Sequence, residues 1–311
     1  MPKFSIIIPL YNKESFVSKS LKSVLNQTFT DYEIIVINDG STDKSVAVVE
    51  QINDKRIKLF HQKNQGVSVA RNKGIALAQA NYICFLDADD FWHTDFLQKM
   101  YELINFYSNE KVFSAAIQIQ TKTALMKAYY KLTNKVAKDI YKENYFKGSM
   151  EYSIICTSCA VFERSVFTKC GVFDEEIKSG QDVDLWIRIG AEYPVIFLNK
   201  ILSTYVYDIN SLSRNRLYKT EIKLKYSKYK DIEERVPFAK KYLDYNRYSE
   251  ILTNKLNGNK ENVRLLKSQI NLKNLRLKQR LLIQLPNFIL KILYDLQPLF
   301  IKLKLRKTVY K

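Results

Sequence analysis

Glycine, proline, cysteine and histidine are scarce in this chain. Its 311 residues include 8 Gly, 6 Pro, 4 Cys and 2 His. So little Gly and Pro excludes collagen-like and linker-like architectures, and four cysteines in a chain this long do not make a disulfide scaffold. The proportions of apolar residues (46%) and charged residues (26%) are those of a folded globular protein.

The N-terminus lacks the pattern of a secretion signal. Met1-Pro2-Lys3 precedes a short apolar run, without the long hydrophobic segment and small-residue cleavage site of a signal peptide. We therefore expect a cytoplasmic protein.

Negative charge is scarce at the C-terminal end. Of the net charge of +18, residues 221–311 contribute 22 Lys and Arg against 8 Asp and Glu, whereas residues 1–220 contribute 28 against 24. This asymmetry predicts a near-neutral catalytic unit over 1–220 and a basic helical extension over 221–311. Basicity confined to one end indicates attraction to a polyanion, either a membrane surface or a nucleic acid.

Short apolar runs alternate with amphipathic stretches over the first 110 residues. The runs lie at 4–9, 32–37, 57–60 and 82–86, with helical patterns near 14–26, 43–53, 67–79 and 94–107. This alternation predicts an α/β fold, a doubly wound and mostly parallel sheet with helices on both faces. Further along we expect strands near 112–120, 155–162 and 195–208, and helices near 122–138, near 183–192 and beyond 220.

An acidic cluster follows the run at 82–86. Ligands of such sheets bind beyond the carboxyl ends of the strands. Asp87 and Asp89 are alternate residues that share one side of an extended segment, so they can converge on a hard cation such as Mg²⁺ or Mn²⁺. One of the aspartates could instead cap the helix that starts near Thr94. Helix capping does not account for three aspartates among four residues.

Two further segments carry polar residues after strands. In Asn38–Asp43, glycine and hydroxyl residues suit a tight turn and a helix start, which leaves the Asp39 carboxylate available to a nucleobase. The segment Asn64–Gly74 opens a helix, and its Arg71 and Lys73 face either a nucleotide or solvent. It matches neither of the glycine-rich phosphate-binding fingerprints, so it gives no support to an ATPase or a dinucleotide-binding protein.

The ordered set of segments resembles the nucleotide-sugar glycosyltransferases of family 2, which have the GT-A fold. The resemblance covers residues 1 to about 215, in the segments Ser5–Asn12, Asn38–Asp43, Ala70–Gly74 and Phe85–Asp90. It implies that the donor nucleotide, usually a uridine nucleotide, is surrounded by Pro9, Tyr11, Asp39, Arg71 and Asp87. It also implies that Asp89 contacts a Mg²⁺ or Mn²⁺ ion on the diphosphate.

The family has a catalytic base on an acidic segment further along the chain. Gly180–Arg188 matches that segment with Gln181 in place of the usual Glu, so Asp182 holds the base position. We expect Asp184 to be structural. After the last strand, Asp208 stands where the family often has a histidine near the metal; it is either a metal ligand or a local turn residue.

The end of the chain, Leu281–Lys311, is apolar but interrupted by charges and prolines. A spanning helix needs about 20 nearly uncharged apolar residues, so we expect this segment to lie in a membrane interface. The apolar set expected to insert is Phe288, Leu290, Leu293, Phe300 and Leu303, and the basic set expected to meet headgroups is Lys302, Lys304, Arg306 and Lys307. The alternative is an amphipathic helix that packs on its own protein.

The resemblance implies an inverting, metal-dependent glycosyltransferase, and together with the basic end of the chain it predicts that the enzyme acts at the inner face of the cell membrane. It would move a sugar from a nucleoside-diphosphate sugar, most simply UDP-linked, to a hydroxyl of a glycan or lipid-linked acceptor in polysaccharide or lipopolysaccharide synthesis. One alternative is a sugar nucleotidyltransferase, which would not need Asp182. Another is a nucleic-acid-binding protein that uses the basic end; we expect no nucleic-acid partner, because that function leaves the acidic cluster unexplained.

The chain also contains one Cys-x-x-Cys pattern, at Cys156 and Cys159. No second pair accompanies it, and it falls in a predicted strand rather than at a helix start, where thiolates are activated. We therefore expect buried core thiols. With only His61 and His93 available, we expect no zinc site.

Overall fold

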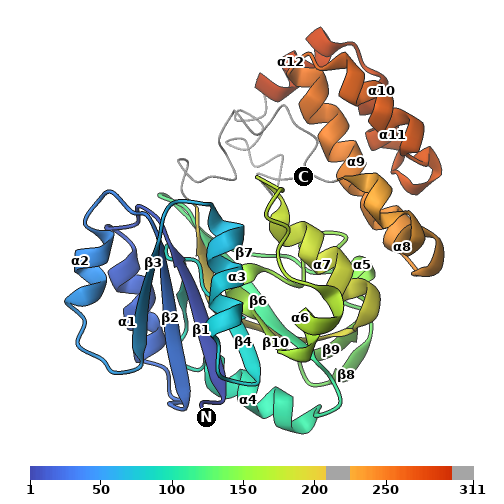
Figure 1. Cartoon of the computed structure of the whole chain (residues 1–311). Helices are drawn as coiled ribbons and strands as arrows, with labels where there is room; N and C mark the ends of the chain where they lie inside the picture. Colours follow the sequence, from blue (N-terminus) through green and yellow to red (C-terminus); the bar gives the residue numbers. More distant parts are fainter. Residues whose placement is uncertain (208–224, 296–311) are drawn as a thin grey trace. The chain divides into compact units, whose positions relative to one another are not determined.

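The computed structural model describes residues 1–207 and 225–295 (Figure 1). The chain divides into two compact units, Met1–Ser211 and Leu212–Lys311. The boundary predicted at residue 220 falls outside the described residues and stays a prediction.

The first unit is built on a mixed sheet. Eleven strands of the described chain belong to it: β1 (Phe4–Leu10), β2 (Tyr32–Asp39), β3 (Ile57–Gln62), β4 (Tyr82–Phe85), β5 (Phe91–Trp92), β6 (Val112–Gln120), β7 (Leu125–Lys127), β8 (Lys135–Ala137), β9 (Ile140–Glu143), β10 (Ala160–Glu163) and β11 (Val195–Val206). The order is β3-β2-β1-β4-β10-β6-β11-β9-β8. Strands β1 to β4 are mutually parallel, and β10 is antiparallel to both of its neighbours, β4 and β6.

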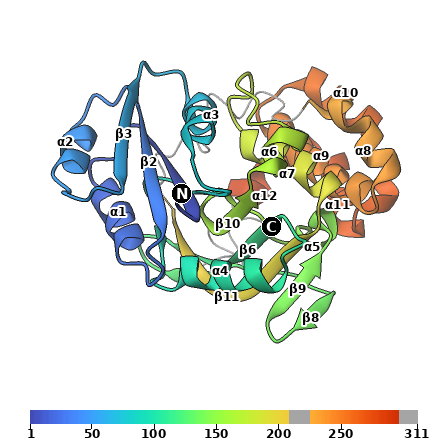
Figure 2. The same cartoon turned by 60° about the horizontal axis from the view of Figure 1, so that its bottom comes forward.

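Helices cover both faces of this sheet (Figure 2). They are α1 (Val17–Leu25), α2 (Ser45–Glu50), α3 (Val67–Leu77), α4 (Phe96–Phe106), α5 (Tyr145–Gly148), α6 (Ser165–Cys170) and α7 (Gln181–Glu192). The predicted α/β sheet with flanking helices is thus confirmed. Because both faces are covered, every residue of β1 and β2 is buried, which explains why these strands are continuous apolar runs rather than alternating ones.

Alternate side chains of β1 pack on opposite faces of the sheet. Phe4, Ile6 and Ile8 belong to the core cluster that also contains residues of α1 and α4. On the other face, Ile7 meets α3 at Gly74, where a Cβ atom would lie 2.3 Å from the Ile7 Cγ2. The missing side chain of Gly74 therefore allows α3 to lie close against the sheet.

Two predicted elements are wrong. The helix near 122–138 is absent from this described segment, which instead forms β7 and β8 joined by extended chain. Pairing of β7 with β6, and packing of the Tyr130 ring 4.7 Å from the Phe197 ring, override the weak helical pattern. The strand predicted at 155–162 begins late, because residues 157–159 form a 3₁₀ turn before β10.

The second unit is helical. Its described elements are two 3₁₀ turns (Tyr226–Tyr229 and Leu272–Asn274) and the helices α8 (Lys230–Arg235), α9 (Ala239–Leu256), α10 (Lys260–Gln269), α11 (Leu277–Gln284) and α12 (Asn287–Asp295). No helix among the described residues has both the length and the apolar character needed to cross a membrane.

The apolar face predicted for the end of the chain is partly exposed. Phe288 is 66% exposed and Leu293 40% exposed, whereas Leu290 is buried within this unit. The expectation that Leu290 inserts into a membrane is therefore wrong, since its side chain is part of the core. Phe300, Leu303 and the basic residues Lys302, Lys304, Arg306 and Lys307 lie outside the described residues.

Candidate active site

The polar ends of three strands meet at one edge of the sheet. Strands β1, β2 and β4 are parallel, with Leu10 opposite Asn38 and Ile7 opposite Phe85. The residues that follow them therefore share the carboxyl-terminal edge, where α/β sheets bind ligands. This edge holds Tyr11, Asp39 and the Asp87–Asp90 segment.

The loops after β1 and β2 are hydrogen-bonded to each other. Asn12 has a φ of 50°, and its side-chain oxygen accepts a 2.8 Å hydrogen bond from the Thr42 backbone N–H. The Asn12 backbone N–H donates to the Ser41 hydroxyl, and the Glu14 N–H donates to the Asp43 carboxylate. These hydrogen bonds join the two short loops into one rim. Beside it, Pro9 is buried in β1, and Tyr11 is 46% exposed, so its ring is accessible to a ligand.

Asp39 is buried, and both of its oxygens already accept hydrogen bonds. Oδ1 accepts from the Gln65 N–H and the Gln62 side chain, and Oδ2 accepts from the Gly66 N–H at 2.9 Å. Its carboxylate therefore fixes the turn that starts α3. Contact with a nucleobase would have to use the lone pairs that remain on these oxygens.

Arg71 on α3 reaches the Asp87 carboxylate. The ion pair has an Nη2–Oδ1 distance of 2.6 Å, and the guanidinium lies 5.1 Å from the centre of the Phe173 ring. Arg71 is 4% exposed. Its Nε and Nη1 have no hydrogen-bond partner among the described residues. Buried donors without partners are rare in native proteins, so these two N–H groups are suited to acceptor atoms of a ligand.

Asp89 pairs with a lysine from the loop after β1. The distance from Lys13 Nζ to Asp89 Oδ2 is 2.6 Å. Burial raises the pKa of Asp89, the attraction of Lys13 opposes this, and the charge of Asp87 adds to it. A positive charge thus already sits where a cation is predicted. The described residues contain no group of three or more His, Cys, Asp or Glu arranged to hold a metal, so a cation at Asp89 would draw most of its oxygen ligands from a diphosphate and water.

The third aspartate, Asp90, is buried and points away from solvent. Its Oδ2 accepts a 2.6 Å hydrogen bond from the Ser158 hydroxyl, and its Oδ1 accepts from the Val206 N–H at 2.9 Å. The Ser158 oxygen in turn accepts from the Asp87 N–H. Burial, with the charges of Asp89 and Asp87, raises the pKa of Asp90 well above its usual value. Ser158 and Asp90 therefore shape the loop that presents the other two aspartates.

Asp182 lies in the first turn of α7, two residues after Gly180, which precedes the helix with a φ of 86°. Two residues separate the end of helix α7 at Glu192 from the start of β11, which runs parallel to β6. Because β11 starts at the amino-terminal edge of the sheet, the first turn of α7 points toward the opposite, carboxyl-terminal edge. Asp184 is fully buried and pairs with Arg188 at 2.7 Å, so it is structural.

Asn72, like Ser158, is a positioning residue that the sequence did not indicate. The Asn72 side chain on α3 donates to the Phe173 carbonyl at 2.9 Å and accepts from the Phe173 N–H at 3.0 Å. Arg188 holds the same segment through the Cys170 and Val172 carbonyls. The segment leading to Asp182 is thereby tied to the helix that carries Arg71. Asp208 lies outside the described residues.

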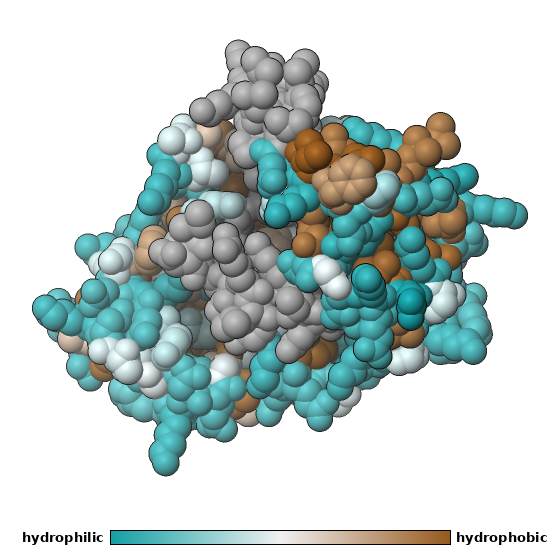
Figure 3. Space-filling model, turned by 90° about the horizontal axis from the view of Figure 1, so that it is seen from above, coloured by the Kyte–Doolittle hydropathy of each residue, from teal (hydrophilic) through white to brown (hydrophobic). Residues whose placement is uncertain are grey.

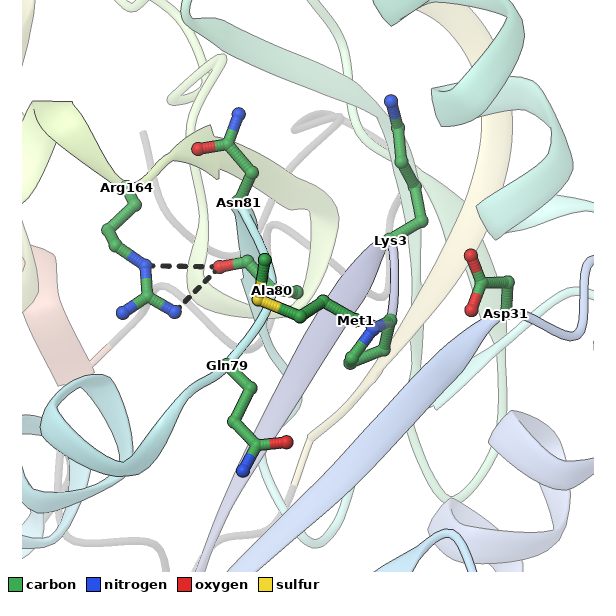
Figure 4. A pocket seen from close by; sticks show the side chains of 8 residues that line it. Met1, Lys3, Asp31, Gln79, Ala80, Asn81 and Arg164 are labelled. Atoms are coloured by element: carbon green, nitrogen blue, oxygen red, sulfur yellow. Dashed lines mark hydrogen bonds between the residues drawn. The ribbon is translucent and has the colours of Figure 1, made fainter.

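One cavity of the described chain lies elsewhere. It measures about 340 Å³ and is lined by residues that precede β1, β2 and β4, including Lys3, Asp31 and Asn81. Figure 4 shows Arg164 at its side, hydrogen-bonded to the Ala80 carbonyl. This is the amino-terminal edge, opposite the aspartates, so the cavity is not the candidate donor site.

The Cys-x-x-Cys segment lies beneath the aspartate loop. Both thiols are free, with their sulfur atoms 2.8 Å apart, and Cys159 is buried. The expectation of core thiols holds for Cys159. The predicted strand conformation is wrong at this point, because Cys156 precedes and Cys159 ends the 3₁₀ turn that contains Ser158.

Comparison with known proteins agrees with this arrangement. The family model described as glycosyl transferase family 2 matches residues 5–171, just over half of the chain. The chain therefore belongs to glycosyltransferase family 2, and its fold is the GT-A fold.

Relatives extend the likeness beyond the family model. An uncharacterized glycosyltransferase of Rickettsia conorii is 33% identical over 210 residues, covering 65% of this chain and 32% of the relative. Glycosyltransferase GlyA of Streptococcus pneumoniae is 30% identical over 229 residues, covering 68% and 32%. The chain thus spans about a third of the length of these relatives.

Among solved structures, S. aureus TarS (residues 1–349) in complex with UDP-GlcNAc matches with a TM-score of 0.61 and 17% identity, covering 86% of this chain and 90% of that one. The complex of the same protein with UDP matches with a TM-score of 0.59 and 15% identity, covering 88% of each chain. At these identities the likeness concerns the fold.

Proposed function

We propose that the protein transfers a sugar, with inversion, from a nucleoside-diphosphate sugar to a hydroxyl of a glycan or lipid-linked acceptor in the synthesis of a cell-surface polysaccharide or lipopolysaccharide. The observation that carries this proposal is the carboxyl-terminal edge of the sheet, where the buried Arg71, with two N–H groups that have no partner among the described residues, pairs with Asp87, and Asp89 follows two residues later. The UDP and UDP-GlcNAc complexes of TarS make a UDP-linked donor the first choice.

In the donor half of the site, a few side chains would bind the base, the ribose and the diphosphate. Pro9, Tyr11, Asp39 and Arg71 would surround the base of the nucleotide, and Asp87 would approach its ribose. Asp89 would hold Mg²⁺ or Mn²⁺ together with the diphosphate, and Asp208 is a candidate further ligand. When bound, the cation neutralises negative charge on the departing diphosphate.

The acceptor half of the site would depend on Asp182. Its carboxylate would take the proton of the acceptor hydroxyl while that oxygen forms a bond to the anomeric carbon, on the face opposite the diphosphate. The carbon–oxygen bond to the diphosphate breaks in the same step, so the anomeric configuration inverts. A nucleotidyltransferase would not need Asp182, so it would not explain why Asn72 and Arg188 anchor the segment that leads to Asp182.

The second unit supplies a candidate membrane contact. Its described surface exposes Leu277, Leu281, Phe288, Ile292 and Tyr294, and apolar side chains gather on the face shown in Figure 3. Lys278, Arg280 and Lys291 stand among them along α11 and α12. Apolar side chains mixed with basic ones are typical of helices that lie in a membrane interface. We propose peripheral attachment to the inner face of the cell membrane.

Calorimetric binding of UDP, GDP and dTDP, each with and without Mn²⁺, tests the donor site. We expect one nucleotide to bind in a Mn²⁺-dependent way, and Asp89→Asn to weaken that binding by about tenfold or more. Asp31→Asn, an exposed aspartate at the opposite edge of the sheet, is the matched control and should bind like the wild type. A folded protein that binds none of the three nucleotides would contradict the proposal.

A further inference from the structure

Residues 121–138 carry positive charge that the described protein does not neutralise. They contain five lysines, Lys122, Lys127, Lys131, Lys135 and Lys138, and no Asp, Glu or Arg. We call these five residues the lysine strip. All five are exposed, and no acidic partner of any of them is found among the described residues. Other lysines of the same unit are paired, such as Lys58 with Glu33 and Lys111 with Glu163.

The strip starts at the edge of the sheet that holds the candidate donor site. Strand β7 pairs with the last residues of β6, placing Lys127 opposite Gln118. Because β6 is antiparallel to β10 and β10 is antiparallel to β4, β6 runs parallel to β4 and ends at the same edge. Lys122 and Lys127 therefore lie on the side of the sheet where Asp87 and Asp89 follow β4.

The strip then crosses the sheet toward the opposite edge. The Tyr130 hydroxyl accepts from the Ile117 N–H, and the Asn134 N–H donates to Glu143 of β9. Strand β9 pairs with the first residues of β11, whose partners in β6 are Phe113 to Ala115. The distance along β6 from Phe113–Ala115 to its end at Gln120 is about six residues, or roughly 20 Å at about 3.3 Å per residue. The spare charge thus extends over the length of several sugar units.

Exposed apolar side chains alternate with the lysines. Tyr129 is 70% exposed, Leu125 60% and Val136 43%. The flat ring of Tyr129 offers an apolar surface to the C–H face of a sugar, while the neighbouring ammonium groups attract anionic substituents.

We propose that the lysine strip docks an anionic glycan, a polymer that carries phosphate or carboxylate groups, as the acceptor. This proposal rests on the proposed function. The reason for choosing a glycan is continuity with the site: a chain whose terminal hydroxyl reaches the Asp182 edge can continue along the strip, with its charges against the lysines.

The test compares two triple variants of the full chain. Lys122→Gln/Lys127→Gln/Lys131→Gln removes charge from the strip. Lys22→Gln/Lys44→Gln/Lys63→Gln removes the same charge from exposed lysines of the β1–β3 part of the unit. The probes are fluorescent dextran that has been phosphorylated and unmodified dextran of equal length, and anisotropy is measured over a range of salt concentrations.

We expect the strip variant to bind phosphorylated dextran about tenfold more weakly at low salt, with a shallower salt dependence, while the control triple variant stays within about twofold of the wild type. Equal loss in both variants would overturn the proposal, and so would equal binding of both dextrans by the wild type. If the strip variant loses binding to phosphatidylglycerol vesicles but still binds phosphorylated dextran like the wild type, the partner of the strip is a membrane. That result would also overturn the proposal.

Nucleotide calorimetry on the same preparations separates the two proposals. If the strip variant binds UDP like the wild type but shows no defect with phosphorylated dextran, only the docking proposal fails. If no nucleotide binds to any preparation, the proposed function fails, whatever the strip does.

Discussion

At the scale of single residues, the carboxyl-terminal edge is held together by ion pairs and buried hydrogen bonds. Asp87 forms an ion pair with Arg71, Asp89 forms one with Lys13, and Asp90 accepts a hydrogen bond from Ser158. A donor nucleotide that enters with a cation would meet side chains that are already oriented, and such preorganisation lowers the cost of binding. The Lys13 ammonium would leave Asp89 when the cation arrives.

Ser158→Ala tests how far this loop depends on one hydroxyl. The variant leaves Oδ2 of the buried Asp90 without its donor and the Asp87 N–H without its acceptor, while Asp90 Oδ1 keeps the Val206 N–H. The expected loss of stability is about 1–3 kcal/mol. We expect Mn²⁺-dependent UDP affinity to fall about five- to tenfold, and Ser158→Thr to restore most of it.

The control for this prediction is Ser5→Ala. Ser5 is also buried and donates to Glu33 at 2.6 Å, but it is the second residue of β1, at the other edge of the sheet. Thermal unfolding should shift similarly in both variants, whereas UDP affinity should fall only in Ser158→Ala. A similar loss of affinity in Ser5→Ala would show that the effect is general destabilisation.

Sequence reasoning found the side chains whose neighbours are local. Asp87 and Asp89 stand on one short segment, and a parallel sheet brings that segment to the end of β2, so their grouping follows from topology. Ser158 and Asn72 were missed because they act across 68 and 101 positions of the chain. Serine and asparagine are ordinary loop and helix residues, and nothing in their local sequence indicates such partners.

Low pH should remove the part of the free energy of unfolding that the Asp54–Arg56 ion pair contributes. Their hydrogen bonds lower the pKa of Asp54 from 3.8 to about 2. A carboxyl with a lowered folded pKa stabilises the fold above its unfolded pKa, near 3.9, and that contribution disappears as the pH falls through about 2. Asp54→Asn should therefore cost about 1 kcal/mol at pH 7 and almost nothing near pH 2.

Urea unfolding of wild type and Asp54→Asn between pH 2 and 7 measures this difference. The exposed Asp31 again provides the control substitution, Asp31→Asn, whose stability should follow the wild type at every pH. A difference between wild type and Asp54→Asn that persists unchanged at pH 2 would contradict the assignment to this ion pair.

At the scale of elements, close packing of α3 on β1 positions Arg71 and Asn72. Gly74→Ala would place a methyl group 2.3 Å from Ile7 Cγ2, and such overpacking costs about 1–3 kcal/mol. We expect lower stability, and weaker UDP binding if α3 moves outward. In the double variant Ile7→Ala/Gly74→Ala the clash is removed, so its loss of stability should be smaller than the sum of the two single losses. Additive losses, measured by urea unfolding, would show that the helix accommodates the methyl elsewhere.

The elements that sequence predicted best are those buried on both faces. The runs beginning at Phe4, Tyr32, Ile57 and Tyr82 begin their strands at those same residues, because a continuous apolar run between turns has few alternatives. The segment 122–138 differs: its exposed lysines carry little periodic signal, and its conformation is set by pairing with β6 and by the packing of Tyr130 on Phe197. The local sequence therefore did not indicate that it forms strands.

At the scale of the whole molecule, the two units are stabilised differently. The first has a large apolar core around its sheet. The second buries charge in its helical core: Arg247 is 3% exposed, forms an ion pair with Glu233, and lies 3.0 Å from Asp244. Removing one partner of a buried ion pair costs more than the pair contributes, because the other charge stays buried. The basic composition of the second unit is therefore partly structural, and only its exposed charges are available to a membrane.

The apolar surface of the second unit gives the membrane proposal its test. Phe288→Ser/Ile292→Ser removes two exposed side chains of α12, 66% and 54% exposed. Full burial of one such side chain in lipid contributes about 1.5–3 kcal/mol, so partial insertion of both should make binding to phosphatidylglycerol vesicles at least about tenfold weaker. Phe106→Ser is the control, since Phe106 is 78% exposed but belongs to the first unit. Vesicle sedimentation should drop for the α12 variant alone. Equal sedimentation of both variants would mean that α12 does not contact the membrane and that charge alone attracts this unit to anionic lipid.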